Sequence, residues 1–263
     1  MIGRAFRKAR ALFTFYLSYM LEYRAEIYLW VLASVLPLIL LGVWARAAET
    51  GAFSLSRVDF IRYFVAVFVV RQFSFIWVIW EFEELVVSGN LSQQLLQPID
   101  PVWRFLASHL TERVVRLPIV LAIAGACFLL YPEAFWLPRP ADLASGIVLL
   151  ALAFCARFAL QYMMSMLAFF SERAAAIEEL WFVVHLFLSG LIAPLDVYPE
   201  PVRRITELTP FPYLIYYPVN LLLGRGAPFG RAVLVLGTWG VLAWLLQRRL
   251  WRRGLRHYSA MGN

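Results

Sequence analysis

Six blocks of this chain are long and apolar enough to cross a lipid bilayer. A membrane-spanning helix needs about 20 mostly apolar residues. The blocks make up about half of the 263 residues, and they are Ile27–Ala45, Phe60–Trp80, Phe105–Tyr131, Leu143–Phe170, Ala175–Leu195 and Phe229–Gln247. We therefore predict an all-α membrane protein with six transmembrane helices.

The sequence between the blocks leaves little room for a second globular unit. The longest gap, Asp196–Pro228, has 33 residues, whereas a domain usually needs about 50 or more. We therefore predict a single membrane domain over residues 1–263, with residues 1–26 preceding the first span.

Positive charge dominates, with a formal net charge of +7, and Lys8 is the only lysine. A P-loop needs a lysine followed by Ser or Thr to hold phosphates and magnesium, but Lys8 is followed by Ala9. Any ATP and magnesium should therefore be bound by a partner chain. The arginines flank apolar blocks, so membrane topology explains them better than a nucleic-acid partner.

Basic residues at both ends of the chain predict its orientation, because Lys and Arg are enriched in cytoplasmic loops. Clusters precede the first block and follow the last one: Arg4, Arg7, Lys8, Arg10 and Arg24, and Arg248, Arg249, Arg252, Arg253 and Arg256. With six spans, both termini are predicted to be cytoplasmic in the cell membrane, although arginines in the outer loop 196–228 weaken the contrast. An alternative is signal cleavage near Ala45–Ala47, which would leave five spans.

The N-terminal segment is predicted to be a helix lying on the membrane surface. Phe6, Ala9, Phe13, Leu17 and Met20 recur at steps of three and four, which places them on one helical face. Basic and aromatic neighbours suit the headgroup region, so lipid is a predicted partner. The alternative is a frayed basic terminus that only sets topology.

The loop after the second block contains a short predicted helix. Gly89 ends the preceding helix and Pro98 stops the next one. Between them Leu91 and Leu95 share one face, and Leu96 follows. Such a helix has the right size to dock into a groove on a cytoplasmic partner, although many inner loops contain a short helix.

The segment after the fifth block is divided by prolines but remains apolar. It runs from Ser189-Gly190 through Pro194-Leu195 and Tyr198-Pro199 to Pro210-Phe211, Tyr213 and Pro218. We predict two short helices that dip back into the outer leaflet. Irregular backbone at membrane depth must be satisfied by protein or water, so the segment should pack against the bundle or a partner.

The order of these features resembles an ABC-2 type transporter permease of the less characterised bacterial kind. The matching motifs are Gly89-Asn90-Leu91 through Leu95-Leu96-Gln97-Pro98 and the proline-rich segment just described. The resemblance covers nearly the whole chain, although each motif alone is loose. It implies a dimer of permease chains, identical or not, with separate P-loop ATPase subunits, an N-terminal interfacial helix and, usually, export. It also implies that the loop helix, with Gly89, Leu91, Leu95, Leu96 and Pro98, couples to the ATPase.

Polar residues inside the spans are candidates for a transport pathway. A charge at mid-bilayer normally faces the bundle interior or a wet cavity, which makes Arg71 and Arg157 the leading candidates. A structural hydrogen bond is the alternative for both. Three further residues complete this set: Gln72, Gln161 and His185. Counting from the turn between spans four and five places Gln161 level with His185, and Arg157 level with Leu188 and Ser189.

Glu178 and Glu179 lie one turn into the fifth block and are candidate gating or coupling carboxylates, pairing with Arg173 or a partner's arginine. The alternative is that they only complement the helix dipole. No catalytic motif or metal-ligand spacing is present, and Cys127 and Cys155 lie within spans.

These features predict the membrane subunit of an ATP-driven exporter, not itself an enzyme, for an amphipathic, lipid-like or glycan-type cargo. A membrane enzyme acting on lipid and a secondary transporter remain as alternatives. The first needs a polar catalytic cluster at one membrane face. The second predicts an internal repeat and acidic midplane residues.

Overall fold

The computed structural model describes residues 2–51 and 53–258, and the regular structure in this part of the chain is entirely helical. The α-helices are α1 Ile2–Glu22, α2 Arg24–Ala33, α3 Leu36–Ala48, α4 Arg57–Ser74, α5 Val78–Val87, α6 Leu91–Leu95, α7 Pro101–Leu130, α8 Pro140–Ser165, α9 Ala175–Leu188, α10 Glu200–Thr206, α11 Phe211–Leu214, α12 Tyr216–Leu222 and α13 Phe229–His257. Three 3₁₀ turns are η1 Pro132–Ala134, η2 Met166–Phe169 and η3 Leu195–Val197. The all-α fold class is thus confirmed.

Five of the predicted spans coincide with helices long and apolar enough to cross a membrane. Within the described residues these candidates are Arg24–Ala48, Arg57–Val87, Pro101–Leu130, Pro140–Phe169 and Phe229–His257. Most are longer than predicted, because a helix continues into charged residues where hydropathy falls. α13, for example, runs on past Gln247 through the arginine cluster.

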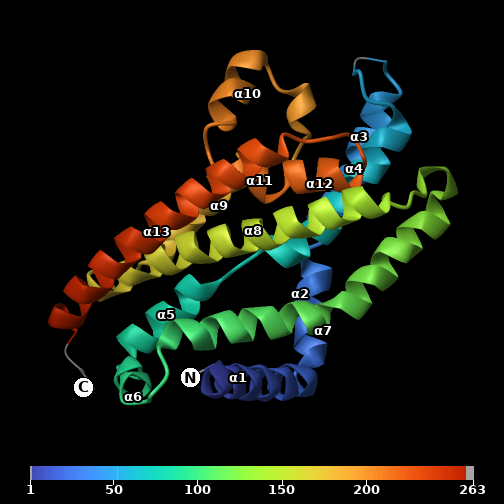
Figure 1. Cartoon of the computed structure of the whole chain (residues 1–263). Coiled ribbons are helices and arrows are strands. Elements are labelled where there is room, and N and C mark those ends of the chain that lie inside the picture. Colours follow the sequence, from blue (N-terminus) through green and yellow to red (C-terminus); the bar gives the residue numbers. More distant parts are fainter. Residues whose placement is uncertain (1, 52, 259–263) are drawn as a thin grey trace.

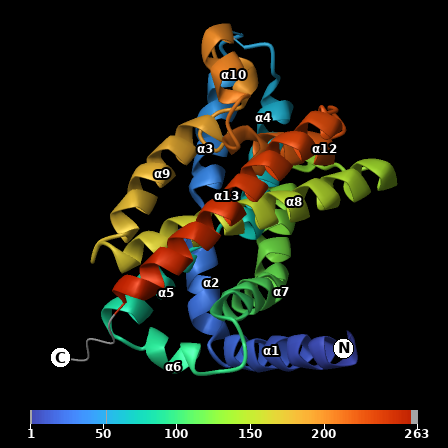
Figure 2. The same cartoon turned by 60° about the vertical axis from the view of Figure 1, so that its left-hand side comes forward.

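The predicted fifth span, Ala175–Leu195, is not confirmed as one helix. α9 has 14 residues, or about 21 Å at 1.5 Å per residue, against a hydrocarbon thickness of about 30 Å. It ends at Leu188, and Gly190 then turns the chain with φ +89°. α9 still runs upward from the turn after α8 towards α10 (Figure 2).

The first two spans are each broken near the middle. α2 and α3 are separated at Ser34–Val35, where Pro37 in the first turn of α3 lacks a backbone N–H and disfavours helix just before it. α4 and α5 are separated at Phe75–Trp77. No proline or glycine explains this second break, which depends on side chains described below.

α4 is the most buried of the long helices. A capping box starts it, in which the Ser56 hydroxyl accepts from the Asp59 N–H at 3.2 Å. Phe60, Tyr63 and Phe64 are fully buried, and they pack in a core shared with α3, α8 and α12. α4 therefore forms the centre on which the other elements are placed.

The proline-rich segment forms three short helices rather than two, and its second half is buried in the bundle. Every residue from Pro210 to Leu221 is buried, and α12 packs against α4 and α8. Its irregular backbone is thus enclosed by protein, the setting in which such backbone is tolerated at membrane depth.

Different helices lie at the two ends of the molecule (Figures 1 and 2). α1, α6 and the end of α13 lie at the lower end, whereas α10 lies at the upper end. The start of α1 and the end of α13 are therefore on the same side of the bundle. α1 lies across this end and packs against α7.

The turn at Gly190 provides a test of this packing. An added Cβ would lie 2.6 Å from the Tyr63 hydroxyl oxygen and 2.9 Å from Tyr216 Cβ, at a positive φ. Gly190→Ala should therefore lower the free energy of unfolding by about 1–3 kcal/mol, measured by thermal unfolding in detergent. Gly237→Ala is the matched control, because nothing lies within 4 Å of its added Cβ; it should be neutral or raise stability by about 0.5–1 kcal/mol. Equal melting temperatures for the two variants would contradict the packing at Gly190.

Candidate functional site

The loop between α5 and α7 contains the predicted short helix. Gly89 has φ +74°, which only glycine adopts without strain, and α6 follows at Leu91–Leu95. Asp100 then caps α7 by accepting from the Val102 N–H at 3.0 Å. Pro98 lies between the two helices, so α6 is held as a separate short element at the lower end.

The three leucines of this loop have different surroundings. Leu91 is fully buried, Leu95 is 38% exposed and Leu96 is 88% exposed. Leu91 packs in a core with Phe82 and Phe105, so it anchors α6 to the bundle. Only Leu95 and Leu96 are left to contact another molecule, so the predicted shared face of Leu91 and Leu95 does not act as one docking surface.

Tyr258 holds the start of α6, which sequence reasoning missed. Its hydroxyl donates to the Gly89 carbonyl at 2.8 Å and accepts from the Ser92 N–H at 3.2 Å. Its ring packs on Phe169, with 5.9 Å between centroids. The end of α13 is thus joined to α6 across 166 residues of sequence, and no local pattern announces this contact.

α1 also reaches the same loop. Lys8 Nζ donates to the Pro98 carbonyl at 3.2 Å. Phe6 and Phe13 line an apolar groove of about 960 Å³ between α1 and the start of α7, opposite Trp103. Three residues of the predicted apolar stripe, Phe6, Ala9 and Phe13, thus line a groove next to the α6 loop.

The first buried polar cluster lies at the breaks in spans one and two. Arg71 donates to the Ser34 carbonyl at 2.9 Å. Gln72 donates to the Ser34 hydroxyl at 2.6 Å and accepts from Arg116 at 3.3 Å. Arg71 and Gln72 therefore satisfy backbone and side-chain groups freed where α2 ends.

Three charged residues of α7 complete this cluster and were missed. Glu112 pairs with Arg113 at 3.0 Å and with Arg116. Arg113 donates to the carbonyls of Phe73 and Phe75 at the second helix break, which explains how this break is stabilised. The i,i+4 spacing of Glu112 and Arg116 is a recognisable ion-pair signal, and a charged triad in the first half of the predicted span Phe105–Tyr131 could have been found from it.

The second cluster joins α8 to α9. Arg157 donates to Glu178 at 2.5 Å, and both side chains are buried. The Arg157 guanidinium also lies 5.1 Å from the centre of the Trp181 ring, and Gln161 lies against the same carboxylate. Arg157, a candidate for the transport pathway, and Glu178, a candidate gating or coupling carboxylate, are thus in direct contact.

This pairing corrects the register counted from the turn between the helices. Counting placed Arg157 beside Leu188 and Ser189, whereas it contacts Glu178 near the start of α9. α8 and α9 diverge from the turn instead of running side by side (Figure 2), and the long arginine side chain reaches back to the first turns of α9. Glu178 therefore pairs with Arg157 of the same chain. It does not pair with Arg173, the partner suggested by the sequence.

The remaining candidates are more dispersed. Glu179 is exposed, whereas Glu178 beside it is buried. His185 is buried and lies against the Phe211 ring, with 6.1 Å between centroids. Glu83 accepts from the Ala175 N–H at 2.6 Å, so α5 supplies the cap for α9 next to the Arg157–Glu178 pair.

The described residues contain no group of three or more His, Cys, Asp or Glu side chains placed to hold a metal ion. Cys127 and Cys155 are free thiols. Polar side chains at the helix breaks are bonded to one another and to backbone carbonyls, whereas the side-chain amide of Gln161 and Nδ1 of His185 are buried without a hydrogen-bond partner among the described residues.

Comparison with protein families gives the transport class. A family model described as an ABC-2 family transporter protein matches residues 28–262, which is most of the chain. The search of curated proteins gave no match. Permeases of this kind are the membrane-spanning subunits of ABC transporters and work with ABC ATPase partners. The resemblance seen in the sequence is thereby confirmed.

Proposed function

We propose that this chain, which belongs to the ABC-2 transporter family, is the permease subunit of an exporter that works as a dimer of permease chains with two ATPase subunits. ATP and magnesium are bound by the ATPase subunits, and the lower end of the bundle faces the cytoplasm. The exposed leucines of α6 at this end carry the proposal. Leu95 and Leu96 expose apolar side chains at a short helix that Leu91 and Tyr258 fix to the bundle.

The charge distribution supports this orientation. The arginine cluster at the end of α13 and Lys8 of α1 lie at the same end as α6. Basic residues mark the cytoplasmic side of membrane proteins. α10 and the segment after it then face the outside of the cell membrane.

The contacts around α6 supply a route from the ATPase to the bundle. Tyr258 joins α6 to α13, and Lys8 joins the loop to α1. Glu83 of α5 holds the start of α9, next to the Arg157–Glu178 pair that leads into α8. A movement of α6 driven by ATP binding is transmitted through these contacts to helices that are otherwise far apart in sequence.

The cargo is proposed to be amphipathic. The bundle is largely apolar and aromatic, with polar side chains confined to a few clusters, which favours a cargo with a large apolar part. Many large apolar side chains on the outer faces of α7, α8 and α13 are exposed, which suits lipid and a second permease chain.

The ATPase contact is tested by affinity purification in mild detergent. Tagged chain should recover a P-loop ATPase, and Leu96→Asp should reduce its recovery at least about tenfold, because burying a leucine contributes roughly 1.5–3 kcal/mol. Leu208→Asp is the matched control: Leu208 is 71% exposed but lies beyond α10 at the other end. Equal recovery with all three proteins would place the contact elsewhere, and absence of any ATPase would contradict the proposed function.

A variant at Tyr258 tests the proposed route from α6 to α13 separately from the contact between the ATPase and Leu96. Tyr258→Phe removes the hydrogen bonds to Gly89 and Ser92 but keeps the ring on Phe169. We expect the ATPase to remain bound and its cargo-dependent ATP hydrolysis in liposomes to fall severalfold, because a typical hydrogen bond contributes about 1 kcal/mol. Unchanged hydrolysis with intact assembly would show that α13 is not part of the route.

A further inference from the structure

A polar pocket opens at the upper end of the molecule, opposite α6. It has a volume of about 360 Å³ and is formed by α10, α12, the start of α13 and the loop before α4. We call it the α10 pocket and define it by Asp196, Arg203, Glu207, Asn220, Arg225 and Arg231. Ligand pockets usually have volumes of about 300–1,000 Å³, so this one has room for a small polar group.

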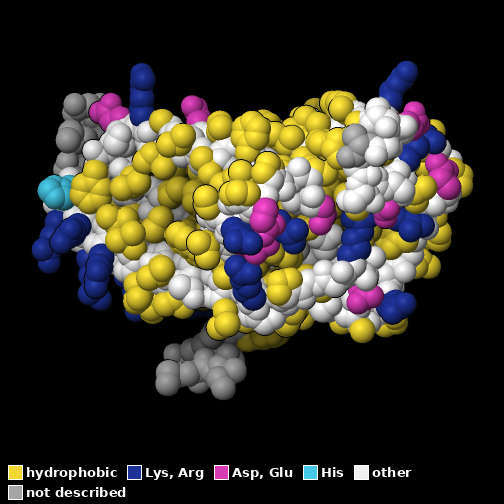
Figure 3. Space-filling view, turned by 90° about the horizontal axis from the view of Figure 1, so that it is seen from above, with side chains coloured by type: hydrophobic (Ala, Val, Ile, Leu, Met, Phe, Trp, Pro, Cys, Tyr) yellow, Lys and Arg dark blue, Asp and Glu magenta, His cyan; other side chains and the backbone are white. Residues whose placement is uncertain are grey.

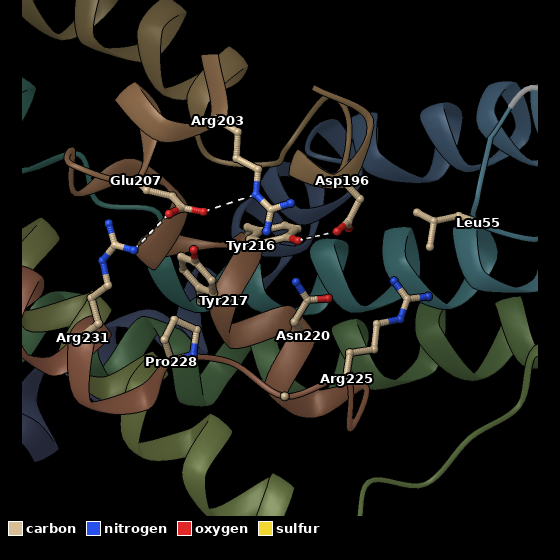
Figure 4. A pocket seen from close by; sticks show the side chains of 11 residues that line it. Leu55, Asp196, Arg203, Glu207, Tyr216, Tyr217, Asn220, Arg225, Pro228 and Arg231 are labelled. Carbon is tan, nitrogen blue, oxygen red and sulfur yellow. Dashed lines mark hydrogen bonds and ion pairs between the residues drawn. The ribbon is translucent and has the colours of Figure 1, made fainter. Parts of the chain in front are cut away.

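Three guanidinium groups surround the pocket (Figure 4). Arg203 and Arg231 share Glu207, at 3.2 and 3.0 Å, and Arg225 pairs with Asp59 behind the pocket at 2.7 Å. Each guanidinium carries five N–H donors, and one nitrogen of each takes part in these ion pairs. Nη1 of Arg225 is buried without a hydrogen-bond partner. The pocket therefore holds guanidinium N–H donors that these ion pairs do not use.

The same pocket also offers acceptors. Asn220 is 5% exposed, and its Oδ1 has no hydrogen-bond partner among the described residues. Asp196 accepts from the Tyr216 hydroxyl at 2.9 Å with one oxygen, and burial and this carboxylate raise the pKa of Tyr216, so its hydroxyl stays a donor. Buried polar atoms without partners are rare in folded proteins. Those of Arg225 and Asn220 leave one donor and one acceptor in this pocket for a polar ligand.

We infer that the α10 pocket binds a phosphate group that carries neighbouring hydroxyls, as in glycerol phosphate. Phosphate oxygens accept from the guanidinium groups, for which arginine geometry is well suited. The hydroxyls donate to Asn220 and to the free oxygen of Asp196. The ligand is either the headgroup of a lipid at the membrane surface or a soluble molecule, since both present the same chemistry.

The surroundings of the pocket fit a headgroup next to apolar chains. Seen from above, Lys, Arg, Asp and Glu side chains gather within a face that is otherwise largely hydrophobic (Figure 3). Arg204 neighbours Arg203 on α10 but is absent from the pocket lining; it pairs with Glu200 at 2.8 Å on the exposed surface. This arrangement supplies a matched control with the same change in charge.

Binding is tested with the full chain in phosphatidylcholine nanodiscs, without ATP or ATPase. Glycerol 1-phosphate is titrated by calorimetry, and retention of phosphatidylglycerol against phosphatidylcholine is measured by native mass spectrometry. Arg203→Gln and Arg231→Gln should each weaken binding about tenfold, the effect of losing one charge-assisted hydrogen bond. Each variant leaves Glu207 with one arginine partner, and melting temperatures check that the fold is kept.

Two variants make the result specific. Arg204→Gln should leave binding within twofold of the wild type. Asn220→Ala should weaken glycerol 1-phosphate severalfold but leave inorganic phosphate unchanged, because only the hydroxyls reach Asn220. Selective retention of phosphatidylglycerol identifies a lipid ligand, and binding of glycerol 1-phosphate alone identifies a soluble one. Failure of both probes, or equal loss with Arg204→Gln and Arg203→Gln, would overturn the inference, and neither result depends on the ATPase partner.

Discussion

Glu112→Ala is expected to lower the free energy of unfolding by about 3–5 kcal/mol, the usual effect of removing one partner from a buried ion pair. Glu112 is 2% exposed and is paired with both Arg113 and Arg116. Its loss leaves two buried arginines without their carboxylate. Arg113 also holds the carbonyls at the end of α4, so the break between α4 and α5 should loosen as well.

This effect is measured by denaturant or thermal unfolding of purified protein in one detergent. Glu200→Ala is the control, because Glu200 forms an exposed pair with Arg204 on α10 and such pairs contribute about 0–1 kcal/mol. Glu112→Gln should fall between the two variants, since it keeps hydrogen bonding but loses charge. A Glu112→Ala protein as stable as the control would show that α7 does not depend on this cluster.

Glu178→Ala should also lower the free energy of unfolding by about 3–5 kcal/mol, because it leaves Arg157 as an unpaired buried charge. The double variant Arg157→Met/Glu178→Leu should recover most of this loss, since buried ion pairs are often replaced by apolar residues without penalty. Unfolding of Arg157→Met, Glu178→Leu and the double variant forms a thermodynamic cycle with the wild type. The coupling between the two positions should exceed about 1 kcal/mol.

The double variant also separates stability from transport. If the pair transmits movement from α9 to α8, the refolded double variant should bind the ATPase normally but lose most cargo-dependent ATP hydrolysis. A double variant with wild-type hydrolysis would assign the pair a structural role only. Additive effects of the single changes would instead contradict the contact between Arg157 and Glu178.

Hydropathy predicted the helices well because a bilayer demands long apolar segments whatever their packing. It failed at Ala175–Leu195, where α9 ends at Leu188 and the chain turns at Gly190. An apolar run reports that a segment is buried in lipid or protein, but not where its helix stops. The break at Phe75–Trp77 was missed for a related reason: Arg113 of α7 stabilises it by bonding the carbonyls there, and the local sequence contains no proline or glycine.

The candidate sites were predictable only where a local signal exists. The backbone properties of Gly89 and Pro98 predict where a short helix begins and ends, and α6 lies between these two residues. Tyr258 could not be found, since its contact with α6 joins residues far apart in sequence. The partner of Arg157 was likewise unpredictable, because it depends on the angle at which α9 leaves α8.

The docking of an ATPase on α6 is tested most directly by photo-crosslinking in the native membrane. A photoreactive amino acid placed at Leu96 contacts whatever molecule covers this exposed side chain, and Leu208, two residues after α10, serves as the same probe at the opposite end. The account predicts a crosslink from position 96 to a P-loop ATPase that position 208 does not form. A probe at position 96 that reaches only lipid, or a protein without a P-loop, would contradict it.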